Sequence, residues 1–364
     1  MKAAIVVLPG DGIGPEVVRE AQHVLAAVAA TGGHQFSFEA HPIGGAAIDA
    51  TGDPLPPSTL AACQHADAIL LGAVGGPRWD DPRATVRPEQ GLLGLRKRLG
   101  LYANLRPVRV HPALADASPL VPKLLVGVDL IFVRELTGGL YFGRPRLRDV
   151  SDGRRRAIDT LEYGEDEIAR VVRLAFRLAR GRNKRVTSVD KANVLESSRL
   201  WREVATEVAA EFPDVALEHQ LVDSCAMRIV TAPRSFDVVV TENMFGDILT
   251  DEAAVLAGSL GLLPSASLGD SARGLYEPIH GSAPDLAGKD VANPIGTILS
   301  AALLLRYSLR LPREAAAVER AVASAIAAGA RTADMSPAPG EALSTQAMGE
   351  RIRRELSAGT SVEP

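Results

Sequence analysis

Residues 8–16 have the sequence Leu8-Pro-Gly-Asp-Gly-Ile-Gly-Pro-Glu16 and follow a short apolar run that begins at Ala3. An apolar run before a glycine-rich segment is typical of a strand that turns into a helix and binds the phosphates of a dinucleotide. The dinucleotide pattern G-x-G-x-x-G needs a glycine or an alanine at its last position, where this chain has Pro15. Proline instead suits the first position of a helix, because its missing N–H would have no partner there. The segment therefore predicts a tight strand-to-helix turn and disfavours a standard Rossmann fold. It leaves open whether this backbone approaches a ligand.

Short apolar runs rich in valine and isoleucine alternate with longer segments of helical periodicity in the rest of the chain. The apolar runs predict strands at 3–8, 68–71, 129–133, 185–189 and 238–241. The periodic segments predict helices at 15–30, 90–98, 165–180, 198–211, 246–257 and 313–328. Because the predicted strands carry few charges, helices are expected to cover both faces of their sheet. The pattern indicates an α/β protein.

The length of 364 residues is comfortable for two domains. Motifs with reactive side chains are spread from residue 10 to residue 293, and no proline-rich linker divides the chain. We therefore expect two intertwined α/β domains around a central cleft, where polar groups from distant segments converge.

The composition limits the partners that are expected. The formal net charge is −4 without a charged tail, so neither nucleic acid nor an anionic membrane surface is expected as a partner. The apolar stretch 295–305 is too short to span a bilayer. Cys63 and Cys225 lack the spacing of a zinc or redox motif, which predicts free, buried thiols in a reducing compartment and a cytoplasmic protein.

Leu92, Leu93 and Arg96 lie in a predicted helix and are spaced to share one of its faces. A guanidinium beside two branched apolar side chains would suit a carboxylate ligand that carries an aliphatic branch. The same spacing fits an amphipathic helix whose arginine only reaches the solvent. Both interpretations stay open from the spacing alone.

Two further arginines, a tyrosine and a lysine lie next to apolar runs. Arg106 and Arg134 are at predicted strand edges or ends, and Tyr141 follows the flexible pair Gly138-Gly139, from which its hydroxyl could enter a cleft as a proton donor. Lys191 ends a predicted strand, where partial burial could let it act as a base near neutral pH. The structural alternatives are a packed tyrosine in a β-hairpin and a surface lysine.

Asp247 and Asp251 are four residues apart on a predicted helix, which places one carboxylate above the other. Such carboxylates repel each other unless a cation lies between them, and short aspartate side chains suit Mg²⁺ or Mn²⁺ better than zinc. Asp223 is a candidate third ligand. Acidic residues that only complement the dipole of a helix N-terminus would give the same pattern.

The segment Glu277-Pro-Ile-His-Gly-Ser-Ala-Pro-Asp285 sets a histidine and an aspartate among small residues and turns. His280 could stack on an adenine ring or form a hydrogen bond to it, and Asp285 could accept hydrogen bonds from ribose hydroxyls. A carboxylate there would repel a 2′-phosphate, which favours NAD over NADP. A plain surface loop is the alternative interpretation.

Together these motifs resemble the isocitrate/isopropylmalate dehydrogenase family of β-decarboxylating dehydrogenases, and within it the enzymes that act on 3-isopropylmalate. The resemblance runs from Ile5 to about Tyr307. The most specific motifs, found in the family's order and spacing, are 134–143 (RELTGGLYFG), 190–194 (DKANV) and 245–251 (FGDILTD). Relatives that act on isocitrate or homoisocitrate usually carry polar or acidic residues where this chain has Leu136-Thr-Gly-Gly139.

The resemblance implies oxidative decarboxylation of (2R,3S)-3-isopropylmalate to 4-methyl-2-oxopentanoate and CO₂ with reduction of NAD, in leucine biosynthesis, with Mg²⁺ or Mn²⁺ as a further cofactor. Two alternatives stay open. One is a sister enzyme acting on isocitrate, homoisocitrate, or tartrate or malate, against which the apolar pair Leu92 and Leu93 argues. The other is a nucleotide-binding or scaffold protein without activity, against which the full set of acidic, basic and phenolic residues argues.

The family's site residues carry over to matching positions of this sequence. By resemblance, the substrate would be bound by Arg96, Arg106, Arg134, Asp223, Leu92, Leu93 and Val194. The metal would be held by Asp223, Asp247 and Asp251, and protons would be transferred by Tyr141 and Lys191. The segments 76–89 and 281–293 would bind NAD, and the residues expected at the cofactor are Gly76, Glu89, Glu277, His280, Gly281, Ser282, Ala283, Asp285 and Asn293.

The resemblance also implies a homodimer with shared active sites, in which Lys191, Val194 and Asp223 of one subunit reach into the site of the other. It implies a fold other than the Rossmann fold. The first domain, on the cofactor side, would comprise 1–101 plus 258–364 and contain both termini. The second would comprise 102–257, with the metal site, the dimer contacts and a β-arm around 134–158.

Overall fold

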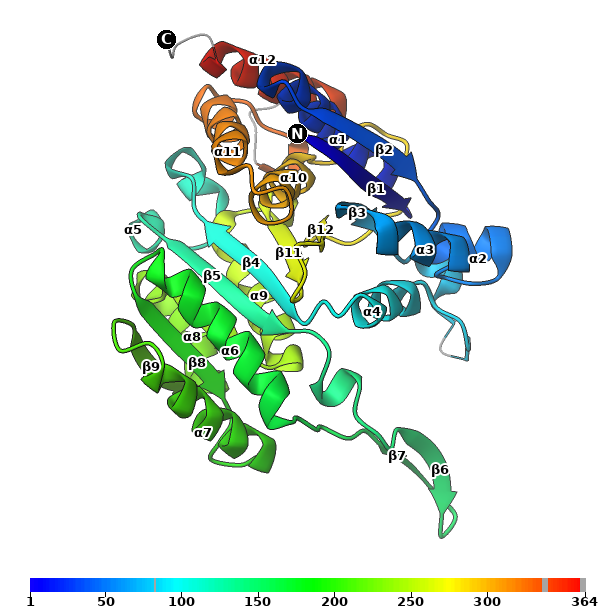
Figure 1. Ribbon diagram of the computed structural model, residues 1–364, viewed down its shortest axis with the longest axis vertical. Coiled ribbons are helices and arrows are strands. Elements are labelled where there is room, and N and C mark those ends of the chain that lie inside the picture. The colour runs from blue at the N-terminus through cyan, green and yellow to red at the C-terminus, as the bar shows by residue number, and fades with distance from the viewer. Residues whose placement is uncertain (82, 336–339, 361–364) are drawn as a thin grey trace. The chain divides into compact units, whose positions relative to one another are not determined.

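A computed structural model describes residues 1–81, 83–335 and 340–360 (Figure 1). The chain divides into two units. The first comprises Met1–Leu101, His111–Pro119 and Ala257–Pro364, and the second comprises Tyr102–Val110 and Leu120–Leu256. Within the described residues, we find no helix with the length and the apolar character that a membrane crossing requires.

The first unit contains strands in the order β2-β1-β3-β12-β11, parallel except for the pair β11 and β12. Its strands are β1 (Lys2–Gly10), β2 (Gln35–Ala40), β3 (Ala68–Ala73), β11 (Pro264–Leu268) and β12 (Gly274–Pro278). Its helices are α1 (Gly14–Gly32), α2 (Gly44–Thr51), α3 (Pro57–His65), α4 (Pro88–Arg98), α10 (Ile295–Tyr307), α11 (Pro312–Ala327) and α12 (Thr345–Thr360). Helix α1 has Pro15 in its first turn, as the sequence predicts, and buries Val17, Ala21, Val24 and Val28 at helical spacing.

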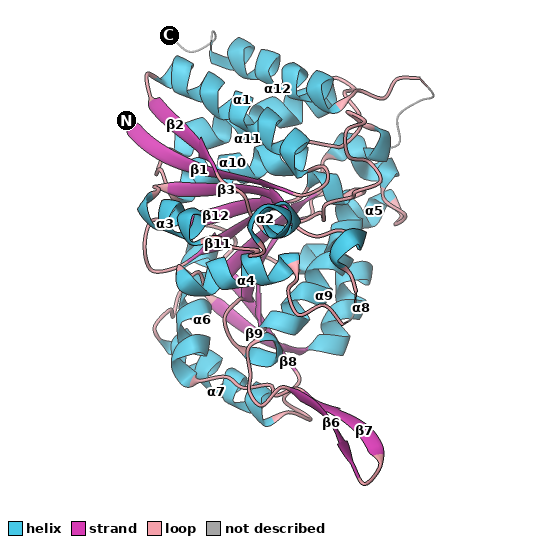
Figure 2. Cartoon of the chain, turned by 90° about the vertical axis from the view of Figure 1, so that its right-hand side faces the viewer, coloured by secondary structure: helices cyan, strands magenta, loops and turns pink. Residues whose placement is uncertain are grey.

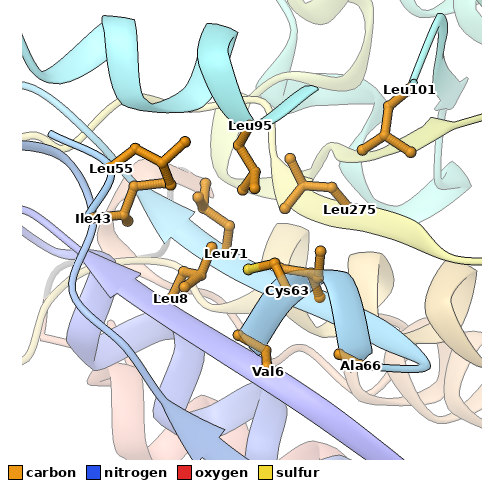
Figure 3. Close-up of a cluster of buried hydrophobic side chains, with 11 residues drawn as sticks. Val6, Leu8, Ile43, Leu55, Cys63, Ala66, Leu71, Leu95, Leu101 and Leu275 are labelled. Atoms are coloured by element: carbon orange, nitrogen blue, oxygen red, sulfur yellow. The ribbon is translucent and has the colours of Figure 1, made fainter. Parts of the chain in front are cut away.

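An apolar cluster of the first unit lies between β1, β3 and the helices α2 to α4 (Figure 3). Leu8 of β1 and Leu71 of β3 are fully buried in it, together with Leu95 of α4. Cys63 belongs to the same cluster, and both cysteines are free and buried, as predicted. Because Leu8 is the first residue of the glycine-rich turn 8–16, this core fixes the point from which the turn starts.

The second unit contains strands in the order β4-β5-β10-β8-β9, parallel except for the pair β4 and β5. Its strands are β4 (Ala103–Arg109), β5 (Asp129–Glu135), β8 (Arg185–Asp190), β9 (Ala216–Leu221) and β10 (Val238–Thr241). Its helices are α5 (Pro122–Leu125), α6 (Glu165–Arg180), α7 (Glu196–Ala210), α8 (Val222–Thr231) and α9 (Asn243–Ala254). The strands β6 (Leu147–Ser151) and β7 (Arg154–Ile158) form a separate antiparallel hairpin within the predicted β-arm (Figure 2).

Every predicted strand and helix overlaps an observed one, and the bounds of α6 and β10 agree fully. Helix α9 begins three residues earlier than predicted, because the Glu242 side chain accepts hydrogen bonds from the N–H groups of Met244 and Phe245 and so caps the helix at Asn243. The edge strands β2 and β9 were not predicted. Their partly exposed, polar side chains give no continuous apolar run.

The segment His111–Pro119 belongs to the first unit, whereas the predicted boundaries place it in the second domain, 102–257. In the first unit, the Arg331 guanidinium donates to the Ala113 carbonyl at 2.7 Å, and Ala117 lies against Gly258. The organisation into two domains, with a cleft, stays a prediction.

Candidate active site

Helix α9 presents two acidic side chains one turn apart, as the sequence spacing predicts. The side chain of Asp247 is 35% exposed and that of Asp251 is 67% exposed. Burial raises the pKa of the Asp251 carboxyl, the Arg106 guanidinium opposes this rise, and the neighbouring Asp247 carboxylate adds to it. Two like charges thus face each other on α9 with access to solvent.

Arg134, at the end of β5, is buried and contacts the first of these carboxylates. Its Nη1 donates to Asp247, and its Nε and Nη2 donate to Asn243 Oδ1 at 3.1 and 2.9 Å. Gly246 makes this approach possible, since a Cβ at that position would lie 2.6 Å from Arg134 Cγ. The motif 245–251 contains Gly246, and Asn243 lies just before it, but the sequence predicts a role for neither.

Arg106 of β4 is also buried, and it reaches both carboxylates of α9. It lies 3.5 Å from Asp247 and 3.4 Å from Asp251, and its Nη1 donates to Thr250 Oγ1 at 2.6 Å. Its Nε donates to Asn104 Oδ1 at 2.7 Å. The antiparallel pairing of β4 with β5 brings Arg106 and Arg134 to the same helix, so two of the three predicted carboxylate-binding arginines lie together.

Tyr141 completes this group. Its hydroxyl donates to Asp247 Oδ2 at 2.8 Å, and the Arg134 guanidinium lies 5.7 Å from the centre of its ring. Burial raises the pKa of Tyr141 to about 12, and the hydrogen bond to Asp247 contributes to the rise. The phenol therefore keeps its proton at neutral pH, as a proton donor requires.

Lys191 and Asp223, which were predicted to serve as a base and as a metal ligand, form an ion pair with each other in the second unit. Lys191 Nζ lies 2.6 Å from Asp223 Oδ1, and the side chains are 27% and 59% exposed. The Lys191 ammonium holds the pKa of the Asp223 carboxyl below its usual range. In the part of the chain that the structure describes, no three histidine, cysteine or acidic side chains gather as a metal site would require. The predicted trio of aspartates is thus not assembled within a single chain.

Arg96 belongs to the first unit, on α4. Its Nη2 lies 2.5 Å from Oε1 of the equally buried Glu277 on β12. Its Nε is buried and has no hydrogen-bond partner among the described residues. Leu92 packs against the apolar cluster of Figure 3, and Leu93 is half-buried. The guanidinium therefore keeps a free N–H donor of the kind that an anionic ligand would use.

His280 follows β12 and is half-buried. Its Nδ1 lies 2.9 Å from the Gly281 carbonyl, and because a carbonyl only accepts, Nδ1 carries the ring proton. Burial lowers the pKa of His280, so the ring is neutral and Nε2 is an acceptor. This Nε2 is buried without a partner within the described residues, while Asp285 is exposed.

Other predicted cofactor residues have structural partners or lie on the surface. Asn293 accepts the Ile295 N–H at 3.0 Å at the start of α10 and donates to Asp334, so it caps a helix. Ser282 is buried, Gly76 and Ala283 are half-buried, and Gly281 and Glu89 are exposed. Within the predicted segment 76–89, Pro82 lies outside the described residues.

A buried polar network behind Tyr141 was not found by sequence reasoning. The Tyr163 hydroxyl accepts the Asn243 N–H at 2.9 Å and lies 3.2 Å from Glu135 and 3.4 Å from Glu242. Burial raises the pKa of both glutamates and of Tyr163. Glu242 directly precedes the observed α9 but not the predicted helix 246–257, and nothing in the sequence marks Tyr163.

The same network supports the loop that carries Tyr141. Glu135 accepts hydrogen bonds from the N–H groups of Thr137 and Gly138 at 2.9 and 2.8 Å. A Cβ on Gly139 would lie 2.6 Å from the Tyr163 hydroxyl, so the loop passes directly over this ring. The start of α9 and the tyrosine loop are therefore held by the same buried side chains.

Comparisons with known proteins agree on one family. A family model described as isocitrate/isopropylmalate dehydrogenase matches residues 4–352. The 3-isopropylmalate dehydrogenases of Anaeromyxobacter dehalogenans and Geobacillus kaustophilus are 68% and 61% identical to this chain, over 98% of its length in each case and 100% and 96% of theirs. A crystal structure of isocitrate dehydrogenase from Methylococcus capsulatus is 35% identical and superimposes with a TM-score of 0.86, over 97% of this chain and 99% of that one. The predicted α/β fold class is confirmed.

Proposed function

Because the chain belongs to the isocitrate/isopropylmalate dehydrogenase family, we propose that it oxidises 3-isopropylmalate with NAD and decarboxylates the product to 4-methyl-2-oxopentanoate and CO₂, in leucine biosynthesis. One observation carries the proposal. Asp247 on α9 contacts the Arg134 guanidinium and the Tyr141 phenol at once, with Arg106 and Asp251 beside it. A hydroxy diacid needs this combination of anion-binding, cation-binding and proton-donating groups.

The donor chemistry of α9 fits a divalent cation. Asp247 and Asp251 offer hard oxygen ligands with access to solvent, and Mg²⁺ and Mn²⁺ prefer such ligands. We assign the cation to these two residues together with Asp223. Positive charge at this position favours loss of the alcohol proton and offsets the negative charge that develops as CO₂ leaves.

The loop after β12 fits the adenosine part of NAD. The nicotinamide part of NAD would supply the hydride acceptor of the reaction. The buried, unpaired His280 Nε2 is an acceptor that the exocyclic amine of adenine can satisfy. Asp285 is exposed and can accept hydrogen bonds from ribose hydroxyls, and it would repel the additional phosphate of NADP.

The remaining residues bind the substrate and move protons. The two carboxylates of the substrate are bound by Arg96, Arg106 and Arg134. The Nε–H of Arg96 has no partner among the described residues and can donate to one of these carboxylates. In its neutral amine form, Lys191 accepts the proton of the hydroxyl group at C2 while the hydride leaves the same carbon. After CO₂ has left the neighbouring carbon, Tyr141 donates its proton there; its raised pKa keeps the phenol protonated until that step.

The sister activity on isocitrate is the competing function, since the solved relative described above is an isocitrate dehydrogenase. Leu92 and Leu93 argue against it, because an apolar pair offers nothing to a third carboxylate. The test measures NADH production from 3-isopropylmalate and from isocitrate, with Mg²⁺ or with EDTA. We expect turnover with isopropylmalate, its loss in EDTA and its return on addition of Mg²⁺. Faster turnover of isocitrate, or turnover that EDTA leaves unchanged, would overturn the proposal.

We further propose a homodimer in which Lys191, Val194 and Asp223 of one subunit complete the site of the other. Val194 is 61% exposed, which is unusual for an apolar side chain beside reactive residues. Met227 of α8 and Ile248 of α9 are also largely exposed on two helices that pack together, as expected of an interface. Asp223 contacts Lys191 within one chain, which leaves the third metal ligand to come from the partner.

Subunit mixing tests the shared site. Each site would take Asp247 from one subunit and Lys191 from the other, so co-expressed Asp247→Asn and Lys191→Ala chains would form heterodimers with one intact site. About a quarter of the wild-type activity is then expected, because half of the dimers are mixed and half of their sites are intact. No activity above that of the two separate variants would place both residues in the same subunit and overturn the shared site.

We also place the enzyme in the cytoplasm. Cys63 and Cys225 are both buried free thiols, which is the state expected in a reducing compartment. Cell fractionation with an antibody against the chain tests this, and recovery outside the cytoplasmic fraction would contradict it.

A further inference from the structure

The glycine-rich turn after β1 is the one sequence motif to which the proposed reaction assigns no role. We propose that this turn, residues 8–16, positions both segments that bind NAD, and that Asp11 is its principal positioning residue. The inference rests on the proposed function in one respect, namely the assignment of residues 76–89 and 281–293 to the cofactor. The whole turn and both segments belong to the first unit.

Asp11 is 5% exposed, and backbone groups satisfy its carboxylate. Oδ2 accepts the N–H groups of Gly45 and Gly75, each at 2.8 Å, and Oδ1 accepts the N–H of Ala46 at 2.7 Å. Gly45 and Ala46 lie in the first turn of α2, where a negative charge also interacts favourably with the helix dipole. A carboxylate held by three backbone donors fixes the chain around it.

One of these bonds fixes the first cofactor segment. Gly75 directly precedes Gly76 and has a φ of +107°, which favours glycine. A Cβ on Gly75 would lie 2.9 Å from Glu89 Oε1, so Glu89 folds back against this backbone. Asp11 therefore sets the position of the backbone on which Glu89, the residue assigned near the nicotinamide, rests.

The rest of the turn fixes the second cofactor segment. The Ile13 N–H donates to the Ser282 carbonyl at 2.8 Å, and a Cβ on Gly12 would lie 1.9 Å from that carbonyl oxygen. Glu16 accepts the Gly288 N–H. Ile13 also packs with Ala283, Leu286 and Ala292 in a small apolar cluster.

The two sets of contacts give the turn its function. Leu8 anchors it in the apolar core (Figure 3), Asp11 holds the segment before Glu89, and the residues from Gly12 to Glu16 hold the segment after His280. The glycines thus admit protein backbone where a dinucleotide-binding fingerprint would admit phosphate. This accounts for a glycine-rich strand-to-helix turn that lacks the fingerprint.

Direct binding of NADH by isothermal titration calorimetry tests the inference, with steady-state kinetics as the second readout. Asp11→Ala removes both acceptor oxygens and with them all three hydrogen bonds, and we expect NADH to bind at least about tenfold more weakly, with a parallel rise in KM for NAD. The KM for isopropylmalate and kcat should change less than about threefold, because the groups that Asp11 holds are backbone N–H groups of the first unit, whereas Arg106, Arg134 and α9 belong to the second. Asp11→Asn, which keeps the size of the side chain, should lie between Asp11→Ala and the wild type.

Glu20→Gln is the matched control. Glu20 is a buried carboxylate on α1 that accepts from Arg353 Nη1 at 2.7 Å, and it contacts neither cofactor segment in the structure. The Glu20→Gln variant should have a lower Tm and an unchanged affinity for NADH. If the Asp11 variants behaved in the same way, with a lower Tm and wild-type NADH affinity, Asp11 would be merely structural and the inference would be wrong.

Glu16→Ala keeps the inference testable should Asp11→Ala fail to fold, because Glu16 is only half-buried and anchors only Gly288. About threefold weaker NADH binding is expected, and unchanged binding would overturn the inference. Failure of the proposed function is a separate result. Wild-type protein that binds NADH but does not oxidise isopropylmalate would disprove the substrate alone, and wild-type protein that binds no NADH would disprove both.

Discussion

Asp11 in the first unit and Asp247 in the second are both carboxylates close to the start of a helix, and the two regions use them in opposite ways. Asp11 is buried, and its three hydrogen bonds come from backbone N–H groups. Asp247 is 35% exposed, and its partners are the side chains of Arg106, Arg134 and Tyr141. Backbone donors cannot leave, whereas side chains can turn to a ligand. A carboxylate of the first kind shapes a site, and one of the second kind can react within it.

The α9 region also shows how strong charges are kept at a reactive site. Arg106 and Arg134 are buried, and a buried guanidinium without a counter-charge is costly. Asp247 and Asp251 supply that counter-charge on the same helix. A substrate dianion and a divalent cation bring equal and opposite charges, so they can take over these pairings without leaving any group unpaired.

The largest effect is expected from substitution of Asp247, the carboxylate held by side chains. Asp247→Asn removes the charge that a cation needs and replaces one of the two carboxylate oxygens, which face Arg134 and Tyr141, with an amide NH₂ group. We expect kcat with Mg²⁺ to fall by about 10³-fold or more. Tm should fall as well, because the buried Arg106 and Arg134 lose part of their counter-charge. Steady-state NADH production and thermal unfolding measure the two quantities.

Asp166→Asn is a suitable control for this variant. Asp166 is an exposed aspartate in the first turn of α6, in the same unit, and its substitution should leave kcat unchanged. Near-normal turnover of Asp247→Asn with Mg²⁺ would remove the metal from α9.

Tyr141→Phe should have the next largest effect, because it removes the proton donor and keeps the ring. We expect kcat to fall by about 10²-fold, with less than about a threefold change in KM for isopropylmalate. The ring contact with Arg134 is retained, so the site should keep its shape. Separate determination of kcat and KM decides the matter: a change confined to KM would show that Tyr141 binds the substrate and donates no proton.

The same comparison explains what could be predicted from sequence. The pairing of Asp247 with Asp251 is local, because four residues of helix place one above the other, and it was predicted. The partners of Asp11 lie 34, 35 and 64 residues away along the chain. No periodicity reports such contacts, so the turn was predicted and the function of its aspartate was not.

The fold shows the same limit. The central strands β5 and β10 were predicted because burial on both faces favours a continuous apolar run, and β8 was predicted from its two valines around Thr187 and Ser188. Tyr163 was missed because its importance lies in distant partners, Glu135 and Asn243, which a single sequence does not connect. Arg106 and Arg134 were assigned to the substrate by resemblance, and their contacts with α9 came only from the structure.

A third change addresses an exposed carboxylate of the first unit that should act on a ligand, in contrast to Asp11. Asp285→Lys replaces the residue assigned to the ribose hydroxyls, and we expect the ratio of kcat/KM for NAD to that for NADP to fall about tenfold. Asp270→Lys, at another exposed aspartate of the first unit, changes the net charge equally and should leave the ratio unchanged. An equal shift in both variants would make the effect one of overall charge rather than of ribose recognition.

The smallest effect is expected for Glu242, which lies next to α9 in the second unit. Like Asp11, it is a buried carboxylate that accepts hydrogen bonds from backbone N–H groups. Glu242→Gln keeps one acceptor oxygen, so a loss of about 1 kcal/mol in the free energy of unfolding is expected at low pH. Burial raises the pKa of Glu242 above its usual 4.5, so its protonated form is favoured in the folded protein. The contribution of protonated Glu242 to the free energy of unfolding is present below pH 4.5 and is lost as the pH rises through the raised pKa. Glutamine does not titrate, so the variant lacks this pH dependence.

The Tm difference between wild type and Glu242→Gln should therefore shrink as the pH rises above 4.5. Glu211→Gln provides a control of opposite sign, because Arg173 holds the pKa of the exposed Glu211 below its usual value. Stability from Glu211 is fully present above pH 4.5 and is lost as the pH falls below it, so any Tm difference there should be constant above pH 4.5 and shrink at lower pH. Thermal unfolding of the three proteins on both sides of pH 4.5 measures both trends. A Glu242→Gln difference that also grew with pH would mean that the cap of α9 works as a charged group, and the pKa of Glu242 would then have been assigned the wrong direction.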